Sequence, residues 1–445
     1  MPELHPVFVD RMSALLGNEL GDFLRALDEP AALALRANPL REGAAGAALS
    51  FADGPVPWAD LGYYLKPRAR PGAGLWHFCG GFYVQEASAM MPASALGIRP
   101  GEKVLDLCAA PGGKSSQIAF ALRGEGLLVS NEPEPKRAKM LAGNLERLGI
   151  GNAVVTNEYP DRLAEKWPGF FDAVLVDAPC SGEGMFRREP DSRTEWTPNG
   201  PEGCAKRQLT ILDSAAILLK PGGRMVYSTC TYNSVENEGV AEAFLRAHPE
   251  FSLRAFALPG LPAAKNGMLK ILPHRVRGDG QFAALFVKSG EGDRPTPKQQ
   301  SGSVSRRDAK APDPAALFRQ FQKDWGVSLE AYSPMLWGDS LCAAPAGSPD
   351  LSGLRVASPG LMLARIAGNR LEPAHQAAMT LRDLPGVTLD DRDALAFVRG
   401  EEVLCDGRGY LAARWHGLPL GWGKASDGVL KNHLPKGLRR AIETP

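Results

Sequence analysis

The feature that most constrains the fold is an alternation of short hydrophobic runs with longer amphipathic stretches between residues 103 and 247. The runs predict strands at 103–107, 127–130, 153–155, 171–176 and 223–227. The amphipathic stretches predict helices from residue 114, at 135–148, at 206–219 with Pro221-Gly222-Gly223 as its stop, and at 235–247. Two further strands are predicted at 269–272 and 282–287. This alternation predicts an α/β fold with a mostly parallel, doubly wound sheet.

The chain of 445 residues is too long for one ordinary hydrophobic core, so two or three domains are expected. A small α/β domain is predicted for residues 1–75, and the doubly wound domain for 76–288. Residues 289–313 are rich in Gly, Ser, Pro, Lys and Arg without an apolar period, which predicts a flexible linker. A C-terminal domain of short strands and turns is expected at 314–445.

Composition is typical of a soluble globular protein, with 44% hydrophobic and 23% charged residues. No apolar run approaches the roughly 18 residues of a membrane span, and the N-terminus lacks a signal-peptide pattern. Seven cysteines do not indicate a disulfide framework, so a cytoplasmic protein is expected. Without a C-x-x-C pair, no metal site is expected. The net charge of +1 carries no nucleic-acid signature, although residues 66–70 and 424–440 are locally basic.

Two cysteines each follow a predicted strand, at the edge where open α/β sheets place their chemistry. Cys180 stands in Asp177-Ala178-Pro179-Cys180, and Cys230 stands in Ser228-Thr229-Cys230-Thr231. A pair of thiols at this edge indicates covalent catalysis, with one sulfur to attack and another to assist release. The alternative for an isolated cysteine is a small buried hydrophobic residue, which is the interpretation for Cys79, Cys204, Cys342 and Cys405.

The first predicted strand turns into its helix through the segment Leu107-Cys108-Ala109-Ala110-Pro111-Gly112-Gly113-Lys114-Ser115. Small residues let the backbone approach a ligand closely, and a helix N-terminus receives anionic groups. A P-loop is excluded because Cys108 stands where it needs a glycine, and the G-x-G-x-x-G dinucleotide pattern is absent. Glu132 ends the second strand, where an acid can bind both ribose hydroxyls, and Asp177 ends the fourth. This set indicates an adenosine-bearing ligand without phosphates; the alternative for Glu132 is an ordinary helix-start carboxylate.

Four segments together carry a family resemblance: Gly81-Phe82-Tyr83-Val84-Gln85-Glu86-Ala87-Ser88, residues 106–115, residues 177–184 and Tyr227-Ser228-Thr229-Cys230-Thr231. They resemble the S-adenosylmethionine-dependent RNA cytosine-5 methyltransferases of the NOP/Sun class, on the side of bacterial ribosomal RNA methyltransferase F. Residues 35–40 resemble the N-terminal signature of that family, and residues 421–439 resemble the tail of its longer members. The resemblance implies a Rossmann-like class I methyltransferase domain between a small N-terminal RNA-binding α/β domain and a C-terminal domain with a PUA-like RNA-binding module.

The resemblance also assigns the cofactor, S-adenosyl-L-methionine, to particular residues. The methionine part would be bound by Cys108, Ala109, Ala110, Pro111, Gly112, Gly113 and Lys114. The ribose would be bound by Glu132, with Arg137 close to the cofactor and Asp177 beside cofactor and base. Related enzymes often carry an aspartate near the adenine after the third strand, where this chain has Asn157 and Glu158, and either could take that role.

The implied reaction is methylation of C5 of cytosine in RNA, with three catalytic residues. Cys230 would add to C6 and make C5 nucleophilic, Cys180 would assist release, and Asp177 would hold the cytosine and support protonation at N3. The base must be unstacked to react, and Arg187-Arg188 and Lys206-Arg207 are candidate phosphate contacts near the site, with ordinary surface charge as the alternative.

The implied substrate is 16S rRNA of the small ribosomal subunit, modified by a monomer that needs no membrane and no metal. Transfer RNA is the alternative substrate. A ribosome-assembly factor that binds RNA without catalysis is the alternative from another class, against which the intact cysteines, Asp177 and glycine loop all count.

Overall fold

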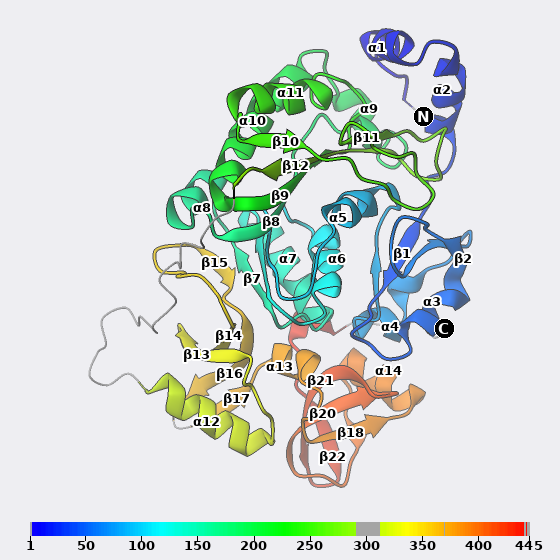
Figure 1. Ribbon diagram of the computed structural model, residues 1–445. Coiled ribbons are helices and arrows are strands. Elements are labelled where there is room, and N and C mark those ends of the chain that lie inside the picture. Colours follow the sequence, from blue (N-terminus) through cyan, green and yellow to red (C-terminus); the bar gives the residue numbers. More distant parts are fainter. Residues whose placement is uncertain (1, 291–311, 369, 440–441, 443–445) are drawn as a thin grey trace.

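The computed structural model describes residues 2–290, 312–368, 370–439 and 442. A large central sheet is flanked by an N-terminal lobe and by two smaller C-terminal sheets, the second of which also packs on the lobe (Figure 1). Its strand order is β10-β12-β9-β8-β5-β6-β7-β15, and β11 (Met268–Ile271) pairs with β12. In that order the strands are Phe251–Leu253, Gln281–Lys288, Leu219–Thr229, Phe171–Asp177, Lys103–Asp106, Leu127–Asn131, Ala153–Thr156 and Val356–Ser358.

The five strands from β9 to β7 are parallel, whereas β10, β11, β12 and β15 pair antiparallel at the two sides. The doubly wound α/β prediction is therefore confirmed, with antiparallel strands added on both sides. Parallel strands that are covered on both faces read as continuous apolar runs, which explains why the sequence revealed them.

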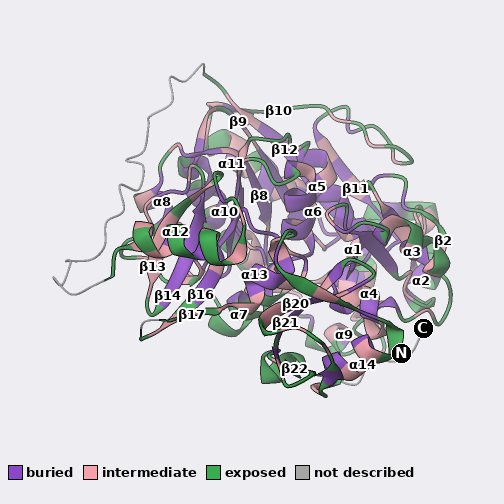
Figure 2. Ribbon diagram, turned by 90° about the horizontal axis from the view of Figure 1, so that it is seen from below, coloured by how far each residue is buried: buried purple, intermediate pink, exposed green. Residues whose placement is uncertain are grey.

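Helices cover both faces of the central sheet, so its strands are buried (Figure 2). On one face Val104, Leu128 and Val226 pack under α5 (Met91–Leu96), α6 (Gly113–Leu122) and α7 (Pro135–Arg147). On the other, neighbouring residues such as Leu105 and Met225 pack under α8 (Pro160–Lys166), α10 (Gly200–Leu218) and α11 (Glu238–Ala247). Successive residues thus point to opposite faces, as strand geometry requires.

Two helix boundaries differ from the sequence predictions. The helix α10 starts at Gly200, one and a half turns before the predicted residue 206, and its first turn contains Pro201, which lacks an N–H that this turn would leave unpaired. The segment Pro221-Gly222-Gly223 was predicted to stop this helix but lies inside β9. The positive φ of Gly222 (72°) accompanies an irregular register against β8, so the glycines form a bulge instead of a helix stop. The other helix, α11, starts at Glu238 and not at residue 235.

The N-terminal lobe has α1 (Pro6–Leu16), α2 (Leu20–Asp28), α3 (Ala44–Phe51), α4 (Leu75–Phe78) and an antiparallel sheet of order β2-β3-β1-β4. Its strands are Ala52–Pro55, Gly62–Leu65, Ala34–Ala37 and Phe82–Val84. Because β4 pairs with β1, this sheet extends past the boundary predicted at residue 75. The predicted linker falls mostly on residues 291–311, which lie outside the described residues.

The C-terminal part contains two small sheets. The first, of order β13-β14-β16-β17 (Tyr332–Trp337, Ser340–Pro345, Leu361–Ala367 and Arg370–Pro373), packs with α12 (Pro314–Trp325) and α13 (His375–Thr380). The second has the order β18-β20-β21-β22-β19 (Gly386–Leu389, Gly409–Trp415, Leu418–Ser426, Val429–Asn432 and Val403–Leu404) and carries α14 (Asp391–Arg399). Between β14 and β16 the chain leaves the first of these sheets to form β15 at the edge of the central sheet. The 314–445 segment is therefore interleaved with the predicted 76–288 domain.

No helix in the described part of the chain is long and apolar enough to cross a membrane.

Candidate active site

The predicted site residues gather at one edge of the central sheet, where the parallel strands β5, β6, β8 and β9 all end. The carboxyl ends of parallel strands share an edge, so the loops that follow them meet there. This edge brings together the glycine loop, Glu132, Asp177 and the two cysteines.

The two thiols lie beside each other, with 3.4 Å between Cys180 Sγ and Cys230 Sγ. The hydrogen bond with Cys230 and burial together raise the pKa of Cys180 well above its usual range. Cys180 therefore keeps its proton at neutral pH and can donate it toward the neighbouring sulfur. A thiol that holds a proton beside a second, reactive sulfur suits a division of roles between the pair.

Buried carboxylates fix the loops that carry the thiols, and the first of them is Glu183. Its Oε2 accepts hydrogen bonds from Thr231 Oγ1 (2.7 Å), Tyr232 N (2.8 Å) and Asn233 N (3.0 Å). A carboxylate that accepts three donors from one short segment holds that segment rigidly. Glu183 therefore sets the backbone position of the residues just after Cys230.

Glu236 makes the reciprocal connection from the Cys230 loop to the Cys180 loop. Its Oε2 accepts from Ser181 N (2.9 Å) and Gln208 Nε2 (2.9 Å), and Asn233 Nδ2 donates to its Oε1 (2.8 Å). The loops also touch directly, because Gly184 N donates to the carbonyl of Cys230 (2.7 Å). A Cβ at Gly184 would lie 2.4 Å from that oxygen, so only glycine fits.

Asp177 lies where the glycine loop meets the Cys230 strand. Its Oδ2 accepts from Lys114 Nζ at 2.6 Å, and its Oδ1 accepts from Ser228 Oγ (2.6 Å) and Gln281 Nε2 (3.1 Å). Burial lowers the pKa of Lys114, but the charge and hydrogen bond of Asp177 outweigh it, so the pKa of Lys114 lies above its usual value. The lysine is therefore charged, and it joins the cofactor loop to the catalytic edge.

The glycine loop is braced from the N-terminal lobe by the buried Arg36 of β1. Its Nη2 donates to the carbonyl of Gly113 (2.7 Å) and to Ser116 Oγ (2.6 Å), while its Nη1 donates to Gln85 Oε1 (2.6 Å). A Cβ at Gly113 would lie 3.0 Å from the Gln85 side chain. The segment around residue 36, which resembles the N-terminal signature of the family, therefore packs against the first turn of α6. The backbone of that turn is expected to contact the ligand.

Asp106 provides a test of whether the site fits a cationic adenosine ligand. Its Oδ2 accepts from Ser115 Oγ (2.7 Å), whereas the buried Oδ1 has no hydrogen-bond partner. Burial raises the pKa of Asp106 to about 7. A buried carboxylate oxygen without a donor, next to a glycine cradle, suits a ligand that carries positive charge. S-adenosylmethionine carries both an ammonium and a sulfonium group, so the residues fit it.

The other predicted cofactor residues cluster around Glu132, which is buried. Arg137 Nη1 lies 3.4 Å from Glu132 Oε2, and Arg137 Nη2 donates to the carbonyl of Ala110 (3.1 Å). Asn157 Nδ2 donates to the carbonyls of Glu132 (2.8 Å) and Pro133 (2.9 Å). These contacts place Arg137 and Asn157 on the same side of the site as Glu132, with their positions set by the loop after β6.

Two other residues near the site have different roles. Glu158 is committed to Arg355, whose Nη2 lies 3.1 Å from Glu158 Oε2, which leaves Asn157 as the polar side chain beside Glu132. Burial raises the pKa of Cys108, so this thiol is an unreactive part of the loop wall.

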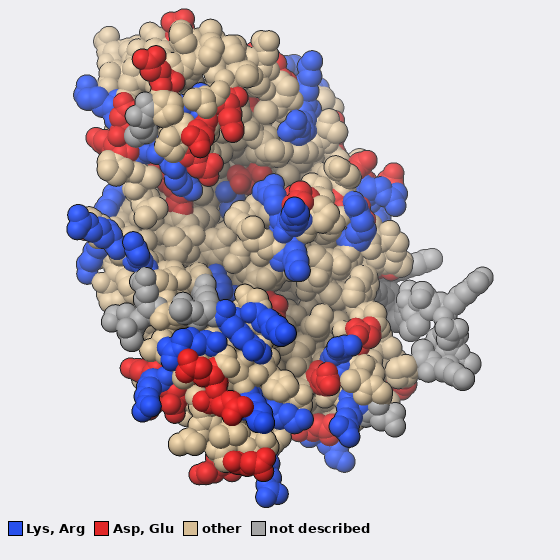
Figure 3. All heavy atoms as spheres, turned by 180° about the vertical axis from the view of Figure 1, so that it is seen from behind, with Lys and Arg blue, Asp and Glu red and all other residues tan. Residues whose placement is uncertain are grey.

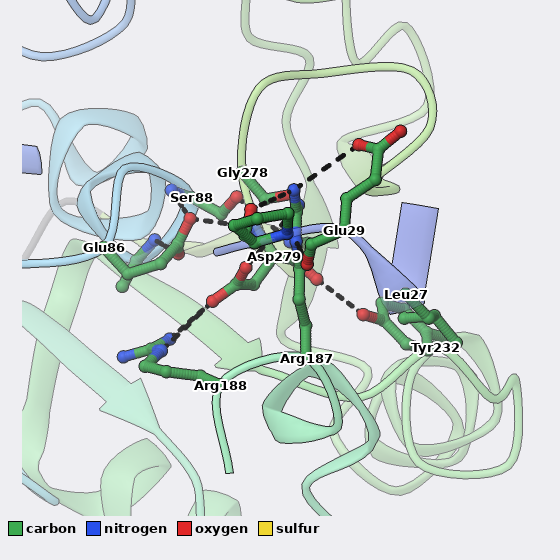
Figure 4. A network of polar contacts seen from close by, with 12 residues as sticks. Leu27, Glu29, Glu86, Ser88, Arg187, Arg188, Tyr232, Gly278 and Asp279 are labelled. Carbon is green, nitrogen blue, oxygen red and sulfur yellow. Dashed lines mark hydrogen bonds and ion pairs between the residues drawn. The ribbon is translucent and has the colours of Figure 1, made fainter. Parts of the chain in front are cut away.

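The sequence-based prediction that Arg187 contacts phosphate is wrong. Its side chain is 7% exposed and donates to the carbonyls of Glu29 (3.0 Å), Pro30 (2.7 Å) and Gly278 (3.3 Å), which ties the N-terminal lobe to the central domain (Figure 4). Arg188 pairs with Asp279 at 3.0 Å in the same network. Lys206 and Arg207 are exposed on α10, so their predicted phosphate contact stays a prediction.

Sequence reasoning assigned no role to Glu183, Glu236, Gln281 or Ser228. Glu183 lies in residues 177–184, one of the segments that resemble the family. The sequence therefore pointed to this position but not to the contacts that Glu183 makes. Within the described residues, no group of three or more His, Cys, Asp and Glu side chains could hold a metal ion.

The sheet order, the glycine loop after β5 and the acid after β6 define a Rossmann-like class I methyltransferase. Family models match four segments: 16S rRNA methyltransferase RsmB/F at residues 93–287, the N-terminal domain of 16S rRNA methyltransferase RsmF at 4–87, the RsmF first C-terminal domain at 320–381 and the RsmF PUA domain at 385–440.

Whole-chain relatives agree with these matches. Ribosomal RNA small subunit methyltransferase F of Vibrio vulnificus (strain YJ016) is 33% identical over 98% of this chain and 98% of its own length. The protein of that name from Shewanella loihica is 33% identical over 87% of this chain and 84% of its own. The chain therefore belongs to the 16S rRNA methyltransferase RsmB/F family, and it is an S-adenosylmethionine-dependent RNA cytosine-5 methyltransferase.

Two solved structures have similar folds. A methyltransferase homologue from Pyrococcus horikoshii is 30% identical, with a TM-score of 0.56 over 63% of this chain and 94% of its own. NSun6 from the same organism, solved with SFG, is 20% identical, with a TM-score of 0.57 over 64% of this chain and 99% of its own, and it supports the fold alone.

The raised pKa of Asp106 predicts a pH dependence of stability. Because its pKa in the folded protein is about 7 and its unfolded value is near 4, its stabilising contribution is complete below about pH 4 and is lost as pH rises through about 7. Between pH 5 and pH 8 the wild type should therefore lose unfolding free energy relative to Asp106→Asn, by roughly 1.4 kcal/mol for each pH unit that lies between pH 5 and the folded pKa of about 7. Urea unfolding of both proteins at each pH measures this. A stability difference that does not change with pH would contradict it.

Proposed function

We propose that this enzyme methylates C5 of a cytosine in 16S rRNA, through a covalent intermediate on Cys230 that Cys180 helps to resolve. The observation that carries the proposal is the 3.4 Å separation of the two thiols, at the end of the sheet where Asp177 also lies. The RNA is chosen because the curated relatives covering nearly the whole chain are named small subunit methyltransferases.

In the proposed reaction the Cys230 sulfur adds to C6 of cytosine, so the C5–C6 double bond becomes an enamine in which C5 is nucleophilic. S-adenosylmethionine, when bound, supplies the methyl group that C5 takes. In release the C5–C6 double bond re-forms as the Cys230–C6 bond breaks, and the C5 proton passes to the Cys180 sulfur, replacing the proton that Cys180 gives to the departing Cys230 sulfur. Cys180, which holds its proton, assists by protonating the departing sulfur.

Asp177 is proposed to hold the base next to the thiols. Its carboxylate is fixed by Lys114, Ser228 and Gln281, so it cannot turn away from the edge of the sheet. A preorganised carboxylate that hydrogen-bonds the cytosine stabilises the protonated N3 that develops as Cys230 adds to the ring.

The target cytosine must be unstacked, which favours a loop or a remodelled helix end of RNA. Lys and Arg side chains are prominent across the middle of the rear face of the molecule, where RNA phosphates could lie (Figure 3). The enzyme is proposed to act as a monomer. The seven free cysteines and the need for a reduced thiol pair support action in the reducing cytoplasm.

Bisulfite sequencing of ribosomal and transfer RNA tests the substrate. A strain that lacks the gene should lose one or more 5-methylcytosines in 16S rRNA, and a plasmid copy should restore them. Loss in transfer RNA alone would indicate the alternative substrate. No loss anywhere would favour a binding factor without catalysis.

Substitution of Cys230 tests the attacking thiol. Cys230→Ala should lower methyl transfer at least about a thousandfold, because the only group that activates C5 is gone. Binding of S-adenosylmethionine, measured by calorimetry, should stay unchanged, since the glycine loop and Glu132 are intact. Cys405→Ala, just after β19, is the matched control and should keep full turnover. Turnover retained by Cys230→Ala would refute the assignment.

Substitution of Cys180 tests release. Cys180→Ala should accumulate a protein–RNA adduct that survives a denaturing gel, because addition to C6 proceeds while elimination is slowed. The adduct should disappear in the Cys180→Ala/Cys230→Ala double variant. An adduct that forms with Cys230→Ala but not with Cys180→Ala would reverse the two roles.

A further inference from the structure

A hollow of about 130 Å³, lined by no residue of the methyl-transfer site, lies where three parts of the chain meet. Its walls come from residues 40–42 of the N-terminal lobe, residues 379–382 at the end of α13 and just beyond it, and residues 414 and 416–419 of the β20–β21 hairpin. Three arginines line it: Arg41, Arg382 and Arg414. No feature of the methyl-transfer site accounts for this concentration of positive charge.

Each arginine is held in place by carbonyl oxygens. Arg41 is 8% exposed, and it donates through Nε to the carbonyl of Cys79 (3.0 Å) and through Nη2 to that of Met379 (2.6 Å). A Cβ at Gly149 would lie 2.3 Å from Arg41 Nη2, so the guanidinium passes directly over a glycine. This close packing fixes the buried guanidinium at the back of the hollow.

The other two arginines stand nearer to solvent. Arg382 is exposed and donates through Nη2 to the carbonyl of Leu40 (3.0 Å). Arg414 donates through Nη2 to the carbonyls of Arg382 (2.8 Å) and Leu384 (2.6 Å). A guanidinium has five N–H donors, so both retain donors that these bonds do not use.

Glu42 also lines the hollow, and the charge of Asp383 acts on Arg414, but neither carboxylate forms an ion pair with the cluster. Among the described residues, none of the three arginines has a carboxylate oxygen within ion-pair distance. Burial, with the nearby charges of Arg382 and Arg147, lowers the pKa of Arg41 to about 10. Buried charges are normally paired, so an anion bound here would relieve both the desolvation and the mutual repulsion.

The hollow also contains an unused hydroxyl. Thr380 lines it, and its buried Oγ1 has no hydrogen-bond partner. Guanidinium forks with a hydroxyl beside them are a typical recognition set for a phosphate group.

We propose that this hollow, the three-arginine junction, binds a backbone phosphate of the substrate RNA and so docks the RNA across the N-terminal lobe and the two C-terminal sheets. The inference rests on the proposed RNA substrate. An RNA phosphate is favoured over a free anion because the junction opens beside exposed Arg382, His416 and Gly417, where a polymer can continue past the bound group.

The test measures binding of full-length protein to transcribed 16S rRNA over a series of KCl concentrations. Arg382→Glu should weaken binding roughly tenfold at low salt and reduce the slope of log K against log salt by about 0.7–0.9, as expected for one lost phosphate contact. In turnover it should raise KM for RNA without changing kcat, because the thiols and the glycine loop are untouched. Arg382→Lys should restore most of the affinity.

Arg365→Glu is the matched control, because it makes the same charge change at an exposed arginine that already pairs with Asp339. It should leave the salt slope unchanged. Arg414→Gln, if its thermal unfolding matches the wild type, should weaken binding in the same direction as Arg382→Glu.

Two results would overturn the inference. One is an Arg382→Glu variant with the affinity and slope of the wild type on an RNA that the wild type methylates. The other is a stabilisation by inorganic phosphate alone. If phosphate raises the unfolding temperature of the wild type but not of Arg382→Glu, while both proteins bind RNA equally well, the hollow is a site for a free anion. A wild type that fails to methylate 16S rRNA would instead contradict the proposed function, so the two failures are distinguishable.

Discussion

The ion pair between Lys114 and Asp177 is the interaction on which the site depends. It connects the first turn of α6, beside the glycine loop, to the end of β8, from which the Cys180 loop departs. A partly buried ion pair offsets the free-energy cost of its desolvation only when its remaining donors and acceptors form hydrogen bonds. Here Ser228 and Gln281 satisfy the second carboxylate oxygen, so β9 and β12 join the same contact. The helix α6 and three strands, β8, β9 and β12, are thereby brought to one relative position at the edge where the chemistry occurs.

Glu183 and Glu236 provide a second set of contacts that fix the site. Glu183 binds the backbone after Cys230, and Glu236 binds the backbone after Cys180, so each loop is held by a carboxylate from the other. The separation of the two sulfur atoms is therefore a property of the folded loops. It does not depend on side-chain rotamers alone, which is the preorganisation that covalent catalysis requires.

The sequence was informative wherever the signal is local. Continuous apolar runs marked the parallel strands, glycines marked the tight turn into α6, and the residue types at strand ends marked the candidate thiols and acids. It was uninformative wherever a role depends on a distant partner. Glu183 contacts a segment about fifty residues away, and Arg36 contacts Gly113 across the two lobes. Neither pairing leaves a local pattern.

The same limit explains the error at Arg187. Two adjacent arginines after the Pro-Cys loop look like surface charge, and only the fold reveals the three carbonyls of other segments that Arg187 binds. Sheet membership was hidden for the same reason. A three-residue strand such as β4 or β15 is recognised by the strand with which it pairs. Three residues are too few to show the alternation of apolar and polar side chains that predicts a strand.

The strand β15 has a consequence for the order in which the protein can be made. The ribosome releases β7 about two hundred residues before β15, so the edge of the central sheet stays uncovered while residues 157–355 are synthesised. An uncovered edge is a site for wrong pairing with other chains. Along the chain, β15 lies between β14 and β16 of the first C-terminal sheet. Because β15 pairs with β7, that sheet is attached to the central sheet and cannot move as an independent domain. A late segment of the chain therefore completes the sheet that residues 103–156 began.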